Sequence, residues 1–162
     1  MILEQKELSR NIELVHVQKL DGENVTEIVK KIAEELKLNT EDIEKAWRVP
    51  TRGGDGKNPR PIIVTLRTKE ARSKWLKTRK ETKITNHNVY QNHDFSQIYI
   101  NEHLTHQMRN LFWATKTNLK DIYKFIWIQN SKILIKKEGT DKKVHQIRFE
   151  SDIQCYIAEN KE

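Results

Sequence analysis

Short β-type runs alternate with longer segments of helical spacing along residues 11–100, and this alternation constrains the fold more than any other feature. In chain order the sequence predicts a strand at 11–17, a helix at 25–36, a strand at 43–49, a strand at 61–68, a helix at 69–81 and a strand at 97–100. This β-α-β-β-α-β order is typical of ferredoxin-like α+β folds.

The two helices of this unit carry clear start signals. Asn24 can cap the first helix, and Glu27 follows three residues later. Thr68 can cap the second helix, whose apolar side includes Trp75, so we expect Trp75 to lie in the core. The polar stretch 85–95 before the last strand predicts a loop.

The residues after about 101 follow a different pattern and predict a second unit. Thr105 can cap a helix with an apolar stripe. Asn130 and Ser131 separate two β-type runs as a two-residue turn, with positive φ favoured at Asn130. A strand at 143–149 and a helix from Ser151 complete this unit.

Positive charge is concentrated after residue 50. The net charge is +7 for the whole chain, composed of −3 in residues 1–50 and +10 in residues 51–162. Its densest part, residues 52–83, is typical of a protein that binds a phosphate backbone. A solubilising surface is the alternative interpretation. The Lys and Arg residues of this part are Arg52, Lys57, Arg60, Arg67, Lys69, Arg72, Lys74, Lys77, Arg79, Lys80 and Lys83.

The chain lacks the motifs of common enzymes and metal sites. The single cysteine, Cys155, excludes an intrachain disulfide and four-cysteine zinc sites. The sequence GGDGKN at 53–58 lacks the spacing and the hydroxyl residue of a phosphate-binding P-loop. His103 and His106 have no acidic partner at a recognised metal spacing. We therefore expect a protein that is not an enzyme and uses no cofactor or metal.

The sequence also predicts no membrane partner. No segment approaches the ~20 apolar residues of a membrane span, and the N-terminus lacks the apolar stretch of a signal peptide. Together with the single cysteine, this pattern predicts an intracellular protein, cytoplasmic and/or nuclear.

Basic and aromatic residues share one face of the helix that follows Thr105. Arg109, Trp113, Lys116 and Lys120 are spaced i, i+4, i+7 and i+11, opposite the apolar stripe. We expect Trp113 to project from this face, because three cationic neighbours make burial costly there. Such a face could stack unpaired bases.

The hairpin predicts a second aromatic face. Its turn pairs Ile128 with Ile133 and Ile126 with Ile135, which places four isoleucines on one face as core. The opposite face has the composition of a platform for unpaired bases, unless another element covers it. Its residues are Tyr123, Phe125 and Trp127 beside Lys132, Leu134 and Lys136.

The first unit lacks the aromatic residues through which RNA-recognition sheets stack bases on their two central strands. Pro61 and Ile63 occupy the aromatic positions of one strand, and Glu13 that of the other. We therefore expect this unit to contact nucleic acid through phosphates, using the charges of loop 51–60 and helix 69–81. The sequence does not decide whether Trp47 lies in the core or on the surface.

Several stretches together resemble a known family. The segments LEQKELSRNIEL, ELKL followed by IEKAWRV, and RPIIVTLRTKEAR are similar to the first-open-reading-frame protein of LINE-type retrotransposons. The segments IYINEHLT, LFWATK and YKFIWIQNSKILIKK are still more similar to related insect transposon proteins and to baculovirus FP (few-polyhedra) proteins. His106 departs from the proline common in relatives, and Ser131 from their turn glycine.

The resemblance implies an RNA-recognition-like (ferredoxin-like) domain at 11–100 and a small α+β C-terminal nucleic-acid-binding domain at 101–162, with a helix and an antiparallel hairpin or three-stranded sheet. Residues 1–10 resemble the end of a coiled coil, through which retrotransposon relatives self-associate. The implied function is binding of single-stranded RNA or DNA, with RNA favoured, and chaperoning of strand annealing. A protein-interaction or viral structural role of the FP type is the alternative.

The candidate binding residues come from both lines of reasoning. The resemblance implies Arg72, Lys74, Lys77, Arg79, Lys80, Arg109, Lys136 and Lys137. The charge and aromatic patterns add Arg60, Lys83, Trp113, Lys116, Lys120, Tyr123, Trp127 and Lys132.

Overall fold

The computed structural model describes residues 2–50, 58–140 and 142–161. The chain divides into two compact units. The first unit comprises Leu8–His103, and the second unit comprises the residues up to Glu7 together with those from Leu104 onwards.

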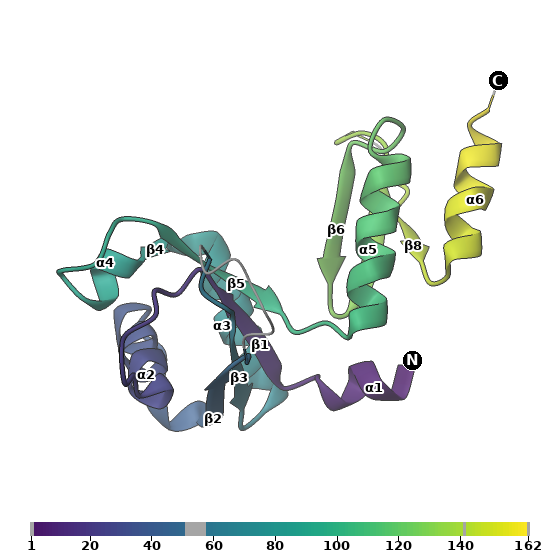
Figure 1. The fold of residues 1–162 in the computed structure, drawn as a ribbon. Helices are drawn as coiled ribbons and strands as arrows, with labels where there is room; N and C mark the ends of the chain where they lie inside the picture. Colours follow the sequence, from purple (N-terminus) through teal and green to yellow (C-terminus); the bar gives the residue numbers. More distant parts are fainter. Residues whose placement is uncertain (1, 51–57, 141, 162) are drawn as a thin grey trace. The chain divides into compact units, whose positions relative to one another are not determined.

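The first unit is an antiparallel sheet with helices packed on one face (Figure 1). Its described strands lie in the order β2-β3-β1-β5-β4. The strands are β1 (Asn11–Val15), β2 (Ile43–Arg48), β3 (Ile62–Leu66), β4 (Ile84–Thr85) and β5 (Gln97–Glu102), and the helices are α2 (Val25–Glu35), the short 3-10 helix η1 (Thr40–Asp42), α3 (Lys69–Glu81) and α4 (Asn86–Val89). The predicted ferredoxin-like α+β class is confirmed.

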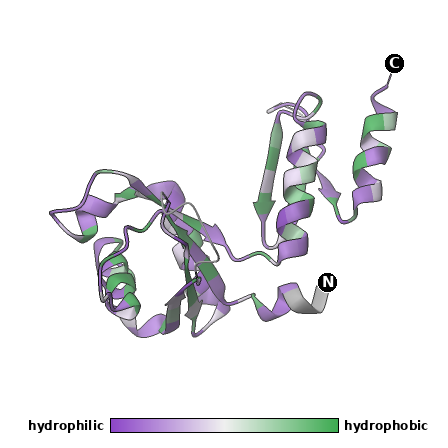
Figure 2. Ribbon diagram, in the orientation of Figure 1, coloured by the Kyte–Doolittle hydropathy of each residue, from purple (hydrophilic) through white to green (hydrophobic). Residues whose placement is uncertain are grey.

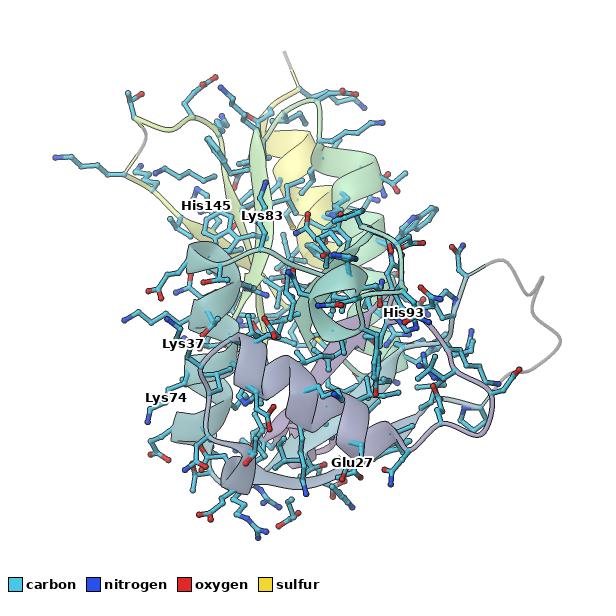
Figure 3. The ribbon with its side chains drawn as sticks, turned by 90° about the vertical axis from the view of Figure 1, so that its left-hand side faces the viewer. Glu27, Lys37, Lys74, Lys83, His93 and His145 are labelled. Carbon is cyan, nitrogen blue, oxygen red and sulfur yellow. The ribbon has the colours of Figure 1, made fainter. Side chains whose placement is uncertain are left out.

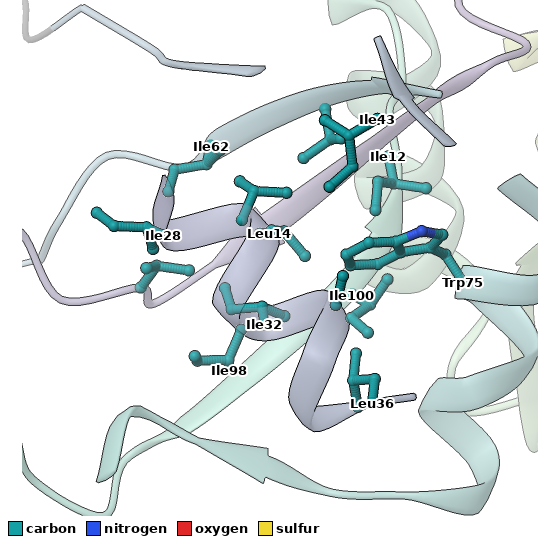
Figure 4. Close-up of a cluster of buried hydrophobic side chains, with 14 of the residues drawn as sticks. Ile12, Leu14, Ile28, Ile32, Leu36, Ile43, Ile62, Trp75, Ile98 and Ile100 are labelled. Carbon is teal, nitrogen blue, oxygen red and sulfur yellow. The ribbon is translucent and has the colours of Figure 1, made fainter. Parts of the chain in front are cut away.

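The core of this unit lies between the sheet and helices α2 and α3 (Figure 4). On β1, Ile12 and Leu14 are buried completely, while Glu13 between them lies on the other face. Helix α2 contributes Ile28 and Ile32 at helical spacing, and its remaining residues are mostly hydrophilic (Figure 2). Trp75 of α3 is 1% exposed, which confirms its predicted place in the core.

The predicted helix starts are confirmed by hydrogen bonds. The side chain of Asn24 accepts the amide N–H of Glu27 at 3.2 Å, and that of Thr68 accepts the amide N–H of Ala71 at 3.0 Å. Each cap satisfies one of the backbone donors that a helix leaves unpaired at its first turn.

The prediction of a loop over 85–95 is wrong in its first part, because β4 and α4 lie there. Asn86 explains why this segment has regular structure. Its side-chain NH₂ donates to the His16 carbonyl at 2.8 Å, and its side-chain oxygen accepts the Gln18 amide N–H at 2.8 Å. These bonds tie α4 to the chain after β1. A polar sequence forms ordered structure here because its polar groups are paired with distant backbone.

The second unit packs helices on a smaller antiparallel sheet of order β6-β7-β8 (Figure 1). Its elements are α1 (Ile2–Glu7), α5 (His106–Leu119), β6 (Phe125–Gln129), β7 (Lys132–Lys136), β8 (His145–Ile147) and α6 (Glu150–Glu159). The predicted hairpin register is confirmed, with Ile126 opposite Ile135 and Ile128 opposite Ile133. Asn130 has the predicted positive φ of 51°, and Ser131 also has a positive φ of 60°.

Two segments of this unit differ from the sequence-based expectation in length or place. Strand β8 has only three residues, and α6 begins at Glu150. The side chain of Asp152 accepts the amide N–H groups of Arg148 at 2.8 Å and Phe149 at 3.0 Å, which bends the chain into the helix. The predicted start of α5 is confirmed, because the Thr105 hydroxyl accepts the Met108 amide N–H.

A largely buried ion pair joins β2 of the first unit to the chain before α2. The Arg48 guanidinium donates to both carboxylate oxygens of Glu23, at 2.6 and 2.9 Å, and also to the Val17 carbonyl at 3.0 Å. The hydrogen bonds from Arg48 lower the pKa of the Glu23 carboxyl below its usual value. The ionised carboxylate is therefore stabilised in the folded state.

Replacement Glu23→Gln should lower the free energy of unfolding by about 2 kcal/mol at neutral pH. Because the folded-state pKa of Glu23 is lowered, the stabilisation is present above the carboxyl's unfolded pKa and is lost as pH falls through the folded one. Urea unfolding at a series of pH values measures this loss. Glu34→Gln, at an exposed position on α2, is the control. A stability difference independent of pH would contradict the assignment.

Candidate nucleic-acid interface

Helix α3 separates its cations from its core residues. Its inner side holds Ala71 and Trp75. Its outer side carries exposed lysines at a spacing of three residues, so that they lie along one face. These lysines are Lys74, Lys77 and Lys80. Figure 3 shows Lys74 projecting from the helix. This face places three positive charges where a phosphate backbone can reach them.

Arg72 does not belong to this outer face, which corrects the expectation drawn from the resemblance. Its side chain is 7% exposed. Its Nη2 donates to a carboxylate oxygen of Glu102 at 2.8 Å, and its Nε donates to the Asn11 carbonyl at 3.0 Å. Arg72 therefore joins α3 to β1 and β5, and its guanidinium is directed into the fold rather than towards a ligand.

The other predicted cations of the first unit lie at its edges. Arg79, near the end of α3, is exposed and donates from Nη1 to the Ile100 carbonyl at 3.2 Å. Lys83 is exposed just before β4, and Arg60 is exposed just before β3. Arg52 and Lys57 of the same charge cluster lie outside the described residues.

The open face of the first sheet has no aromatic residue on its two central strands, β1 and β3, as predicted. Glu13 lies opposite Ile63 in the register, and Trp47 of β2 lies on the other side of Ile63. Trp47 is 37% exposed, and the ammonium of Lys45 lies 5.5 Å from its ring centre. This resolves the open question about Trp47 in favour of the surface.

Sequence reasoning missed Tyr99 of β5. It is 45% exposed and lies opposite Val15 of β1. Its signal was present in the alternation of β5, because Ile98 and Ile100 are buried on either side of it. A strand that buries one face must present the intervening residue on the other.

Trp113 projects from α5 as expected, with 69% of its surface exposed. Arg109, Lys116 and Lys120 are also exposed. The ammonium of Lys116 lies 4.5 Å from the ring centre of Phe112, so it leans towards that ring. The face thus combines an exposed indole with cations on the same helix.

The hairpin face is only partly as predicted. Phe125 is 39% exposed, and Trp127 is half-buried with its indole N–H donating to the Gln129 side chain at 3.2 Å. Leu134 and Lys136 are also half-buried, and Lys132 and Lys137 are exposed.

Tyr123 is not part of the hairpin face and corrects that prediction. It is 2% exposed and packs edge to face with Tyr156 of α6 at 5.9 Å between ring centres. Its hydroxyl accepts the side-chain NH₂ of Asn160 at 3.3 Å. Tyr123 precedes β6 rather than belonging to it, so strand alternation does not govern its direction, and it completes the core under the helices.

The two aromatic surfaces of the second unit lie on opposite sides of it. Met108, Leu111 and Leu119 of α5 join the core formed by the isoleucine face of the hairpin. Trp113 is therefore on the side of the helix turned away from the sheet, whereas Phe125 and Trp127 belong to the opposite face of the sheet.

Among the residues that the structure describes, no cluster of three or more His, Cys, Asp or Glu side chains could hold a metal ion. Over the same part of the chain, no helix combines the length and apolar character needed to cross a membrane.

Two family models match the chain. That of the Baculovirus FP protein domain 1 matches residues 9–100, and that of the Baculovirus FP protein domain 2 matches residues 105–156. Together they cover most of the sequence. No curated protein matches it significantly.

The variant Arg72→Met tests the separation between structural and surface cations on α3. It leaves the buried Glu102 carboxylate without its guanidinium partner and should destabilise the protein by about 3–5 kcal/mol. The matched variant Lys74→Met, at an exposed position of the same helix, should change stability by no more than about 0.5 kcal/mol. Thermal unfolding followed by circular dichroism measures both. A fully stable Arg72→Met protein would contradict the buried role.

Proposed function

We propose that this chain, which belongs to the baculovirus FP protein family, binds single-stranded nucleic acid without catalysing a reaction on it. RNA is the favoured ligand because the first unit has the strand and helix order of RNA-recognition domains. The proposal places the protein inside cells, in the cytoplasm and/or nucleus, where its free, exposed Cys155 would stay reduced.

The exposed indole of Trp113 is the observation that carries the proposal. This large apolar ring has 69% of its surface in water. A flat partner that covers the ring lowers the free energy by removing that surface from water. The cations of the same helix favour a partner that is both flat and negatively charged. An unpaired nucleotide has these two properties, because its base can stack and its phosphate is anionic.

The lysines of α3 support the same ligand through a different interaction. Phosphate contacts by exposed lysines release counterions and do not depend on base sequence. The open sheet face does not provide the central aromatic pair of sequence-reading RNA-recognition sheets. We therefore propose binding with little base specificity.

Opposed surfaces on the second unit suit an annealing chaperone. The outer face of α5 and the outer face of the hairpin could each hold a separate strand, because the core lies between them. Two strands on one small unit raise the local concentration of each for the other. Annealing activity is thus part of the proposal.

A protein-interaction role in a viral structure is the second candidate. Phe125 and Leu134 on the hairpin face, and the exposed Phe149 before α6, are apolar groups that another protein could cover. A titration with single-stranded RNA at two salt concentrations separates the candidates. Absence of RNA binding at the lower salt concentration would favour the interaction role.

The triple variant Lys74→Gln, Lys77→Gln, Lys80→Gln should make RNA binding less sensitive to salt. On single strands each phosphate contact contributes about −0.7 to the slope of log affinity against log salt, so the slope should become about 2 units less steep. Fluorescence anisotropy with a labelled oligouridine measures it. The control replaces the exposed lysines Lys19, Lys31 and Lys37 with glutamine. Equal slopes for both triple variants would place the phosphate contacts elsewhere.

Trp113→Ala should weaken binding of single strands by about tenfold or more, since stacking contributes ~1–3 kcal/mol per base. The variant's preference for single strands over duplex should fall as well, because the base faces of a duplex are hidden between neighbouring base pairs. Trp113→Phe keeps an aromatic ring and should retain most of the affinity. A Trp113→Ala protein that unfolds several degrees lower and binds normally would assign the indole to stability instead.

A further inference from the structure

A groove runs along the outer edge of β5 in the first unit. Its volume is about 280 Å³, and its walls include Arg79 and Thr82 at the end of α3 and Tyr99 and Asn101 of β5. It exists because β4 is short and pairs with Gln97 and Ile98 alone. Among the described strands, none pairs with the rest of this edge of β5. The groove is smaller than the about 300–1,000 Å³ of typical small-molecule pockets.

Tyr99 forms the aromatic wall of this groove. Its ring is 45% exposed and meets the ring of His16 edge to face, with 5.6 Å between ring centres. His16 is held next to β1 in a left-handed conformation, with φ of 70°. Its carbonyl accepts the buried side chain of Asn86. The contact therefore holds Tyr99 in place while leaving much of its surface open to a ligand.

Arg79 forms the charged wall. Its Nη1 donates to the Ile100 carbonyl at 3.2 Å, which fixes the guanidinium above the edge of β5. A guanidinium carries five N–H donors in a fork that fits phosphate oxygens, so one bond to the backbone leaves it able to bind a phosphate. Lys80, Glu81 and Lys83, all exposed, follow Arg79 in the sequence, so this stretch has a net positive charge.

The charge around this groove distinguishes it from the larger cavity of the first unit. That cavity, of about 540 Å³, is lined by Glu41 and Asp42 together with Lys30 and Arg67, so its charges are mixed. Among the described residues that line the groove, Arg79 is the charged one, and it is positive. Charge complementarity therefore favours an anionic ligand at the groove beside β5.

We propose that this groove is a nucleotide subsite of the first unit, in which the base stacks on Tyr99 and the neighbouring phosphate is bound by Arg79. The inference rests on the proposed function and adds to it. It gives the first unit a stacking contact on β5, although its central strands offer none. Bases of any kind can stack there, which agrees with little sequence preference.

A peptide that adds as a new strand to β5 is the competing occupant of an open sheet edge. Strand addition would use the Ile100 carbonyl as an acceptor, and the Arg79 guanidinium already donates to that carbonyl. An incoming strand would have to share this carbonyl with Arg79 or displace the guanidinium, whereas a phosphate can bind to the guanidinium's remaining N–H donors. The observations favour the nucleotide.

The decisive variant is Tyr99→Leu, tested in the full chain by fluorescence anisotropy with labelled oligouridine. We expect affinity to fall about fivefold or more, with an unchanged salt slope, because stacking is lost and no charge is removed. Tyr99→Phe is the matched control and should bind as the original protein does. An oligomer of abasic ribose phosphate should bind to Tyr99→Leu and to the original protein equally well.

Arg79→Gln tests the phosphate contact separately. It should make the salt slope about 0.7 units less steep, whereas Lys37→Gln, at an exposed position outside the groove, should not change it by as much. Thermal unfolding checks that both variants remain folded. Because Tyr99 and Arg79 are exposed, we expect the melting temperatures to stay close to that of the original protein.

The outcomes separate this inference from the proposed function. If the original protein binds oligouridine and Tyr99→Leu binds it equally well, the subsite is refuted while nucleic-acid binding stands. If the original protein binds neither RNA nor DNA, the proposed function fails and the subsite fails with it. Protection of the Ile100 and Glu102 amides from hydrogen exchange by an added peptide would identify strand addition and overturn the nucleotide assignment.

Discussion

Strand β1 pairs with a neighbour on both sides, and the first unit depends on this central position. Its register with β3 and β5 places Ile12 and Leu14 on one face, where α2 and α3 bury them completely. Every second residue of the paired strands must then lie on the open face. The division of this unit into a helix-covered face and an opposite face therefore follows from the register of β1 with its two neighbours.

That division decides which charged residues are available to a ligand. Arg72 and Lys74 are two positions apart on α3, yet one is buried against Glu102 and the other is exposed. A buried arginine needs a partner because an isolated charge is costly inside a protein. Glu102, at the end of β5, supplies the partner. Net charge alone therefore overestimates the surface that can bind phosphate.

In the proposed function, the two units would offer different interactions to a nucleic acid. The first unit presents lysines along α3 and a groove with one aromatic residue, whereas the second presents the largely exposed indole of Trp113 on α5. Charge attraction acts over several ångströms and is screened by salt, while stacking requires contact and is not. A protein that combines them can attract a flexible strand and then hold its bases.

The sequence by itself determined the order of the main strands and helices, the caps at Asn24, Thr68 and Thr105, and the pairing of the hairpin, because these depend on residues close together in the chain. It also predicted the exposure of Trp113 from the periodicity of one helix. Only the tertiary structure decided that Arg72 and Tyr123 are buried and that the polar segment at Asn86 is ordered. It alone revealed the groove at Tyr99. Each of these depends on partners distant in sequence, such as Glu102 for Arg72 and Tyr156 for Tyr123, and local patterns carry no information about which distant residues meet.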